Sequence, residues 1–335
     1  MLIIKRMIAA ALCGAAALAA AGCAGIDEAP ENSGASGSSD LKIVCSTFPA
    51  YDWARELTSG REGVEISYLL EKGTDMHSFQ PTADDILKIS QCDLFVYVGG
   101  ESDKWAEDAI KGAANEDLRS LSLLEAIGSN AKAEEVKEGM QAEEEEEGEH
   151  QEHSDAPEYD EHVWLSVKNA KLLCEKLAEE LSAIDSEHKE TYTSNLSAYS
   201  EKLTRLDSDF EALAAGAKNK TLIFGDRFPF RYFTEDYGFD YYAAFVGCSA
   251  ETEASFETIT FLASKLDELQ VKTVYTIEGS DQKIAQTIIS SSKSGDTKIS
   301  VLDSIQSVTQ ERIIAGENYI SIMQKNYDTL KETLN

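Results

Sequence analysis

Residues 41–70, LKIVCSTFPAYDWARELTSGREGVEISYLL, place a helical segment between two β-rich runs. The runs are Leu41–Ser46 and Val64–Leu70, and the segment Ala50–Ser59 between them has a helical pattern. A strand, a helix and a second strand in this order are the repeating unit of a parallel α/β sheet. We therefore predict that this stretch begins an α/β lobe.

The alternation continues along the chain and recurs in the C-terminal half. A helix at Thr82–Ser90 and a strand at Asp93–Gly99 extend the first lobe. The strands predicted in the second half are Thr221–Gly225, Tyr241–Val246, Lys272–Ile277 and Lys298–Leu302, and the helices are Ser255–Leu269, Asp281–Ser292 and roughly Thr309–Leu334. The sequence thus predicts two lobes, each a mainly parallel sheet flanked by helices.

Two long helical segments, Val167–Ala183 and Glu187–Ala215, separate the halves. The second carries an apolar residue at every third or fourth position, which predicts one buried stripe. The stripe consists of Tyr192, Leu196, Tyr199, Leu203, Leu206, Phe210 and Leu213. We expect a long helix at 186–216 that joins an N-terminal lobe, 41–185, to a C-terminal lobe, 217–335.

The N-terminus has the features of a secretory signal. Two basic residues precede an apolar run of about 15 residues, which is shorter than a membrane-spanning helix needs. The residues AAGC that end at Cys23 resemble a bacterial lipobox. We predict a lipoprotein signal peptide at 1–22, acylation of Cys23, and a flexible Gly- and Ser-rich tether at 23–40. The folded part would then lie outside the cytoplasm, held at the cell membrane by its lipid.

Charge and cysteine spacing exclude other classes. The net charge of −31 opposes binding to nucleic acid, whose phosphates would be repelled, and suits cations. No CxxC pair supports a structural zinc knuckle. Cys45 lies near the end of its predicted strand and Cys92 lies just before its own. If the two strands are parallel neighbours, the thiols lie at opposite ends of the sheet, and we predict no disulfide between them.

The acidic segment 133–161 interrupts the α/β pattern. It contains the unbroken run Glu143–Glu147, together with His150 and His153. Such a density of like charge opposes folding and is typical of a mobile loop. Because carboxylates and imidazoles bind divalent metals, we expect His150 and His153 to capture metal loosely.

Four side chains are candidate ligands of a tighter metal site. His77 and His162 lie on predicted loops of the first lobe, and Asp226 and Asp303 follow predicted strands of the second. Ligands bind beyond the carboxyl ends of parallel strands, so these positions fit a site in the cleft with two nitrogen and two oxygen donors. Each residue alone also fits a plain surface or helix-capping role.

Five motifs resemble those of the metal-binding substrate-binding lipoproteins of zinc and manganese ABC transporters. They are KIVCSTFPAYD at 42–52, HSFQPTADD at 77–85, CDLFVYVGG at 92–100, HVWLS at 162–166 and YFTEDYG at 232–238. The resemblance covers residues 41–334. It implies two α/β lobes joined by a rigid helix, with a metal buried between them, no enzymatic activity, and an ABC transporter permease as the partner.

The resemblance also assigns ligands. It matches His77 to the first ligand, although Met76 replaces the usual Pro, and His162 to the second. The third ligand of the family, a His or Glu, is missing from FGDRFPFRYF at 224–233, where Asp226 and the non-ligand Arg227 lie near the expected position. Cys248 and Glu251 are alternatives, and a site with three protein ligands and a water is also open. The fourth ligand matches Asp303, with Glu278 as the alternative.

The predicted function is capture of Zn²⁺ for delivery to an ABC importer. Two His and two carboxylates also suit Mn²⁺, but zinc-binding members often carry a His-bearing acidic loop before the second ligand, as this chain does. A secreted zinc metallohydrolase is a further alternative. It would need a general base beside the metal, for which Glu161, next to His162, is the one hint.

Overall fold

The computed structural model describes residues 41–141, 158–249 and 253–334, which all belong to one compact unit. Two four-stranded sheets form its two lobes, in the orders β2-β1-β3-β4 and β6-β5-β7-β8. Every recorded strand pair in both sheets is parallel. In each sheet, the chain adds strands first on one side of the initial strand and then on the other. Ligands of α/β proteins bind at the position where the strand order reverses in this way.

The first lobe is built around four short strands, of which the central two are largely buried. They are β1 (Leu41–Cys45), β2 (Val64–Tyr68), β3 (Leu94–Tyr97) and β4 (Arg119–Ser122). The accompanying helices are α1 (Phe48–Leu57), α2 (Ala83–Gln91), α3 (Lys104–Lys111) and α4 (Leu123–Ala126). A capping box between Thr82 and Asp85 fixes the start of α2, as the acidic residues of its first turn predict.

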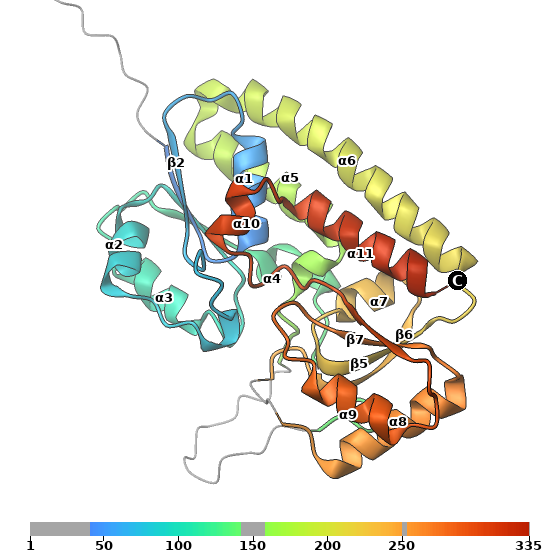
Figure 1. Ribbon diagram of the computed structural model, residues 1–335. Helices are drawn as coiled ribbons and strands as arrows, with labels where there is room; N and C mark the ends of the chain where they lie inside the picture. The colour runs from blue at the N-terminus through green and yellow to red at the C-terminus, as the bar shows by residue number, and fades with distance from the viewer. Residues whose placement is uncertain (1–40, 142–157, 250–252, 335) are drawn as a thin grey trace, which may run out of the picture. The chain divides into compact units, whose positions relative to one another are not determined.

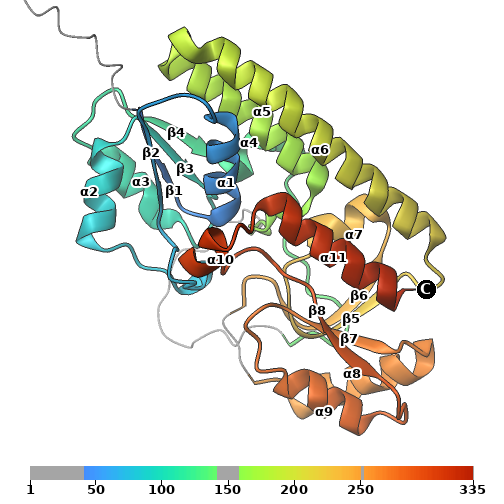
Figure 2. The same ribbon diagram turned by 45° about the horizontal axis from the view of Figure 1, so that its top comes forward.

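The second lobe repeats this arrangement. Its strands are β5 (Thr221–Phe228), β6 (Asp240–Val246), β7 (Thr273–Thr276) and β8 (Lys298–Val301). Its helices are α7 (Arg231–Tyr237), α8 (Phe256–Leu269) and α9 (Lys283–Ser291). Figures 1 and 2 show α8 and α9 together on one side of this sheet, away from the first lobe.

Three long helices run along both lobes. They are α5 (Val167–Ile184), α6 (Lys189–Gly216) and α11 (Tyr319–Thr333), and α6 and α11 lie side by side in both ribbon views (Figures 1 and 2). Six of the seven residues of the predicted stripe on α6 are buried, and Leu196 is partly buried. The predicted fold of two α/β lobes joined by a long helix is confirmed. None of the described helices is both long and apolar enough to cross a bilayer.

The C-terminal helix differs from the prediction. One helix at Thr309–Leu334 was expected, but the structure has α10 (Gln310–Ile314) and then α11. Gly316 has φ +90°, which only glycine adopts readily and which ends the first helix. Asn318 then caps α11 through a capping box with Ser321. The prediction of a single helix was therefore wrong, because it passed over the helix-ending Gly316 and the N-cap at Asn318.

The prediction for the cysteines is confirmed. Cys45 and Cys92 are both buried free thiols. Cys45 is aligned with Val96 across the β1–β3 pair, and Val96 lies four residues along the chain from Cys92. At about 3.3 Å per residue, this offset puts the two thiols well beyond bridging distance.

The described ends of the acidic segment pair with each other and with the second lobe. Glu134 N–H donates to the Glu158 carbonyl, and Asp160 N–H donates to the Lys132 carbonyl, each at 2.9 Å. Gln141 N–H donates to Ala244 at the edge of the second sheet. Both ends of the segment are thus attached beside the cleft. Glu143–Glu147, His150 and His153 lie outside the described residues.

Candidate metal centre

His77 is held by a tight turn after β2. The side chain of Asp75 accepts the His77 N–H at 3.0 Å and caps the single 3₁₀ turn Met76–Ser78. Met76 is buried beneath the turn and anchors it to the core. The imidazole is largely buried, with 6% of its side chain exposed. The fold therefore fixes His77 at the carboxyl end of the first sheet.

His162 is fixed at the start of the segment that leads into α5. Asp160 Oδ1 accepts hydrogen bonds from both the backbone N–H of His162, at 2.9 Å, and its Nδ1, at 3.0 Å. Trp164 packs edge-on against the imidazole and donates its indole N–H to the Ser304 carbonyl in the second lobe. His162 is fully buried. Its position is therefore set by both lobes.

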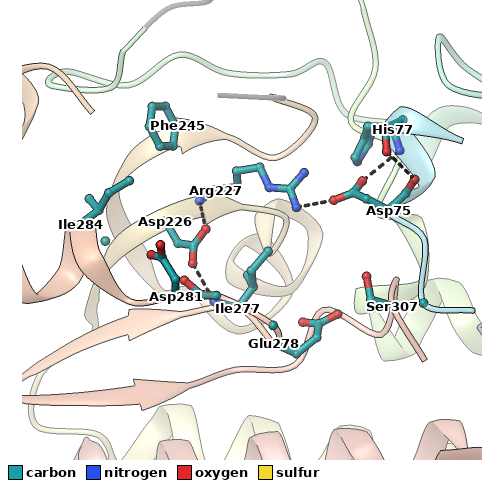
Figure 3. A pocket seen from close by; sticks show the side chains of 15 residues that line it. Asp75, His77, Asp226, Arg227, Phe245, Ile277, Glu278, Asp281, Ile284 and Ser307 are labelled. Carbon is teal, nitrogen blue, oxygen red and sulfur yellow. Dashed lines mark hydrogen bonds and ion pairs between the residues drawn. The ribbon is translucent and has the colours of Figure 1, made fainter. Parts of the chain in front are cut away.

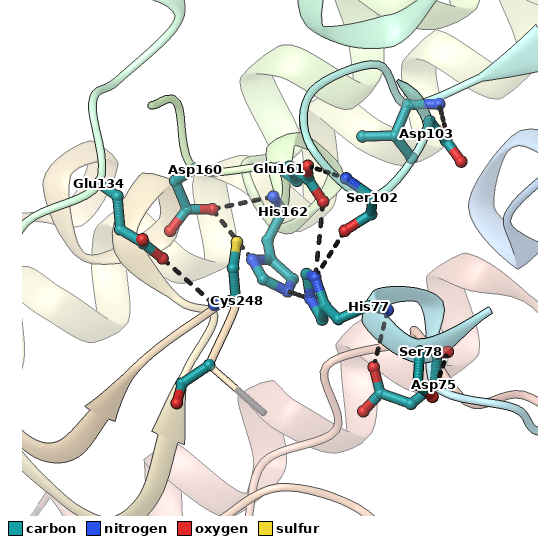
Figure 4. A network of polar contacts seen from close by, with 12 residues as sticks. Asp75, His77, Ser78, Ser102, Asp103, Glu134, Asp160, Glu161, His162 and Cys248 are labelled. Atoms are coloured by element: carbon teal, nitrogen blue, oxygen red, sulfur yellow. Dashed lines mark hydrogen bonds and ion pairs between the residues drawn. The ribbon is translucent and has the colours of Figure 1, made fainter. Parts of the chain in front are cut away.

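The two imidazoles meet through their Nε2 atoms, which are 3.2 Å apart (Figure 4). Their outer nitrogens are occupied, since Nδ1 of His162 contacts Asp160 and Nδ1 of His77 contacts Ser102 Oγ at 2.8 Å. A tetrahedral zinc ion with Zn–N bonds of about 2.05 Å separates two nitrogen ligands by about 3.3 Å. The pair therefore has the spacing and the outer hydrogen bonds of metal-binding histidines.

The protonation states of the two rings differ. Burial and the neighbouring His162 lower the pKa of His77 to about 3, so its ring is neutral. Burial also opposes the charged form of His162, but the Asp160 carboxylate outweighs this and raises its pKa above the usual value. The contact between the two Nε2 atoms needs one proton between them, whichever ring carries it. One proton thus occupies the position between the two nitrogens, where a cation could replace it.

Cys248 is the third residue of this group. It follows β6 in the second lobe, and its Sγ lies within 4.8 Å of ligand nitrogens of His77 and His162 (Figure 4). Among the described residues, these three form the only group of His, Cys, Asp or Glu ligand atoms that is this compact. Burial raises the pKa of the Cys248 thiol far above its usual value.

A cavity of about 480 Å³ opens beside His77 (Figure 3). Asp226 and Glu278 of the second lobe line it. The Asp226 carboxylate accepts hydrogen bonds from the backbone N–H groups of Arg227 and Ile277. Burial and the nearby Asp303 raise the pKa of Glu278 to about 7, and both its oxygens accept hydrogen bonds from Ser304. Neither carboxylate belongs to the compact group of ligand atoms.

Asp303 also lies apart from that group. Its carboxylate pairs with Arg312 at 2.5 Å and accepts the Ile305 N–H at 2.9 Å. The structure thus brings His77 and His162 together with Cys248, the alternative ligand, and not with Asp226 or Asp303. Glu251, together with the lipidation residue Cys23, lies outside the described residues.

Sequence reasoning missed the side chains that support the imidazoles. Asp160 and Ser102 hold the outer nitrogens, and Glu161 accepts the Ser102 N–H at 2.9 Å. Burial raises the pKa of Glu161 to about 7. Asp160 and Glu161 directly precede His162, but they were counted as part of the charged loop. Asp160 is 2% exposed and Glu161 is 1% exposed. Nothing in the sequence indicates that these two acidic residues are buried.

Comparison with known proteins finds similarity to proteins named for zinc binding and zinc uptake. The family described as "ZnuA: Zinc-uptake complex component A periplasmic" matches residues 43–333. The chain is 31% identical to the zinc-binding lipoprotein AdcA of Streptococcus pneumoniae serotype 4 over 295 residues, which are 88% of this chain and 56% of AdcA. It is 30% identical to the high-affinity zinc uptake system protein ZnuA of Bacillus subtilis, over 90% of this chain and 92% of ZnuA. The chain spans about half the length of the AdcA proteins it matches.

Solved structures agree with the sequence matches. The Zn(II)-bound ZnuA-like domain of Streptococcus pneumoniae AdcA is 27% identical, with a TM-score of 0.68 over 88% of this chain and 99% of that domain. The metal-dependent lipoprotein YcdH of Bacillus subtilis is 25% identical, with a TM-score of 0.70 over 88% of this chain and 99% of YcdH. Both structures share the two-lobed fold.

Proposed function

Because this chain belongs to the ZnuA family of zinc-uptake components, we propose that it captures Zn²⁺ outside the cytoplasm and delivers it to an ABC-type importer. The observation that carries the proposal is the His77–His162 pair, whose Nε2 atoms are 3.2 Å apart. Two imidazoles that converge in this way, with both outer nitrogens held, form half of a tetrahedral zinc site. Relatives named as zinc-binding or zinc-uptake proteins support the choice of metal.

Binding is favoured because the fold has already ordered the ligands. His77 lies on a capped turn and His162 lies under Trp164, so little conformational entropy is lost when the metal arrives. The ion replaces one proton between the rings, and Asp160 compensates part of its charge. Tight capture therefore requires no large rearrangement of the first lobe.

Release requires that contacts between the lobes change. His162 is fully buried, and the Trp164–Ser304 hydrogen bond ties its segment to the second lobe. We propose that docking on the permease favours a conformation in which the loops around His162 move and the ion leaves through the cavity beside His77. No catalytic step is involved.

Carboxylates of the second lobe are proposed to complete the coordination of the ion. Asp226 and Glu278 line the cavity next to His77, and a small movement of the second lobe would bring a carboxylate to the ion. Asp303 is proposed on the family resemblance, and it would first have to leave Arg312. Mn²⁺ stays the alternative metal, since carboxylate ligands would favour it.

The proposed location follows from the N-terminus. Acylation of Cys23 would hold the folded part at the outer face of the cell membrane, within reach of the permease. A short lipid anchor and a tether of about 18 residues would allow the protein to diffuse to its transporter.

Uptake of radioactive zinc by the source cells tests the proposal. Deletion of the gene should lower zinc uptake under zinc limitation and leave manganese uptake unchanged. The wild-type chain should restore zinc uptake, whereas His162→Ala should not. Restoration of manganese uptake alone would instead support the Mn²⁺ alternative, and unchanged uptake of both metals after deletion would overturn the transport function.

A further inference from the structure

We propose that Cys248 supplies the third protein ligand of the zinc site as a thiolate, so that the second lobe closes the His77–His162 pair with a sulfur atom. This inference rests on the proposed function and names the donor that the comparisons leave open. The thiol proton would be released to solvent as the S–Zn bond forms, and the zinc ion would then be held by two nitrogens from the first lobe and one sulfur from the second. A fourth position would stay available to water or a carboxylate.

The distances fit a site that tightens when the metal binds. The Sγ atom and the ligand nitrogens of both histidines all lie within 4.8 Å of one another. With a Zn–S bond of about 2.3 Å and Zn–N bonds of about 2.05 Å, a tetrahedral ion needs S···N separations of about 3.5 Å. The loop after β6 would have to approach by about 1 Å, a shift that a loop can make without unfolding either lobe.

The backbone of this loop is shaped for close approach to His162. A side-chain carbon at Gly247 would lie 3.0 Å from Cε1 and 3.1 Å from Nδ1 of His162, and 2.9 Å from the Phe228 carbonyl. Glycine therefore allows Cys248 to come next to the ring. The Cys248 N–H donates to Glu134 Oε1 at 3.2 Å, which ties the loop to the segment that precedes Asp160 and His162.

Arg227 explains why the ligand comes from this loop and not from β5. Its guanidinium forms an ion pair with Asp75, on the turn that carries His77 (Figure 3). It also donates to the Ser249 carbonyl at 3.2 Å. A permanently charged guanidinium cannot bind a metal cation. Arg227 thus fills the space at the end of β5 and at the same time holds the Cys248 loop against the first lobe.

A second feature of the pocket also indicates a cation. Glu161 is 1% exposed, and its Oε2 lies 3.5 Å from His77 Nδ1 without a hydrogen-bond partner of its own. A buried carboxylate oxygen without a hydrogen-bond partner raises the free energy of the folded protein unless positive charge lies near it. Zinc bound to neutral imidazoles and one thiolate would leave a net charge of +1, which Glu161 and Asp160 would offset.

A thiolate ligand would also set the choice of metal. Sulfur is a soft donor that binds Zn²⁺ strongly and Mn²⁺ poorly, whereas a carboxylate in the same place would reduce this difference. Cys248 is therefore expected to be the residue that makes the site selective for zinc.

Cobalt substitution gives the test. Co²⁺ replaces Zn²⁺ in tetrahedral sites, and a thiolate bound to it produces an intense near-ultraviolet charge-transfer absorption that nitrogen and oxygen ligands do not. The wild-type Co²⁺ complex should show this band, and Cys248→Ser should abolish it. Zinc affinity should fall by more than the roughly 10–100-fold typical of losing an outer-shell partner. Cys248→Asp should also abolish the band and narrow the preference for Zn²⁺ over Mn²⁺.

Cys92→Ser is the matched control, because Cys92 is a buried thiol of the first lobe outside the metal group. It should retain the band and the zinc affinity. If Cys248→Ser retains the band, the thiolate ligand is overturned and the zinc-binding function is not. The same holds if the wild-type protein binds Co²⁺ without the band, provided that His162→Ala abolishes this Co²⁺ binding. A wild-type protein that binds neither Co²⁺ nor Zn²⁺ would overturn both.

Discussion

Replacement of Asp160 by asparagine should weaken zinc binding without moving His162. The carboxylate accepts two hydrogen bonds from His162 through the same oxygen, Oδ1. Asparagine retains an oxygen acceptor in that place, so the turn and the ring orientation should survive. What is lost is the negative charge behind the imidazole, which makes the ring a better donor and offsets the charge of the ion.

The expected magnitude follows from the burial of this pair. Asp160 is 2% exposed and His162 is fully buried, so neither water nor salt screens the contact effectively. Loss of the carboxylate behind a metal-binding histidine lowers metal affinity by about 10–100-fold. This corresponds to about 1.4–2.7 kcal/mol at 1.36 kcal/mol for each factor of ten.

Competitive titration against a chromophoric zinc chelator measures the effect, in low and in high salt. The loss of zinc affinity in Asp160→Asn should be the same at both salt concentrations, because the Asp160–His162 pair is buried. It should shrink as the pH falls, because Asp160 raises the pKa of His162 and the wild-type protein therefore meets more competition from protons. Asp185→Asn is the control, since Asp185 contacts His188 Nδ1 at 2.9 Å outside the metal group. Wild-type affinity in Asp160→Asn, or an equal loss in Asp185→Asn, would refute the reasoning.

Three further predictions concern other parts of the chain. Cys23→Ala should release the protein from the membrane, and metabolic lipid labelling should detect acylation of the wild type alone; an unlabelled wild type would contradict the anchor. Deletion of Glu143–His153 should remove a weak, salt-sensitive class of zinc sites in calorimetry and leave tight binding nearly unchanged; loss of the tight class would contradict this division. Burial raises the pKa of Asp52 to about 6 despite its hydrogen bond from Tyr319 N–H. Because this folded-state pKa lies above the unfolded value of about 4, the stability that Asp52 contributes is lost as the pH rises from about 4 through about 6. Asp52→Asn should therefore flatten the pH dependence of the free energy of unfolding and raise it at neutral pH by up to about 3 kcal/mol. The measurement is denaturant unfolding at several pH values. If Asp52→Asn shows the same pH dependence of the free energy of unfolding as the wild type, the reasoning is wrong.

The fold was largely predictable because the central strands of both sheets are buried. Runs such as Leu41–Cys45 combine apolar residues with β propensity, and the long helices carry a clear apolar period. Elements without an apolar run or a clear apolar period were missed. The sequence of β4 is RSLS, and it lies at the edge of its sheet, so it lacks a hydrophobic run. Helix α7 (Arg231–Tyr237) was missed because its short sequence, RYFTEDY, contains too few turns to show a period.

Candidate site residues could be named from the sequence where they lie in a distinctive local motif. His77 and His162 were named from such motifs, and the structure brings their Nε2 atoms together. Asp226 was expected at the end of a strand that stops at Gly225. The strand instead continues to Phe228 through an irregularity, and the Asp226 carboxylate bonds to backbone within the sheet. Only the three-dimensional path of β5 shows that Arg227 holds the loop of Cys248.

The most direct test of the central claim is the zinc affinity of three single-histidine variants, measured by the same competitive titration. His77→Ala and His162→Ala each remove one of the two converging Nε2 atoms, whereas His188→Ala removes an Asp-bonded imidazole outside the metal group. We predict that His188→Ala binds one zinc ion as tightly as the wild type, and that His77→Ala and His162→Ala lose this tight class. Wild-type affinity in either of the latter two variants would contradict the assignment of the metal centre.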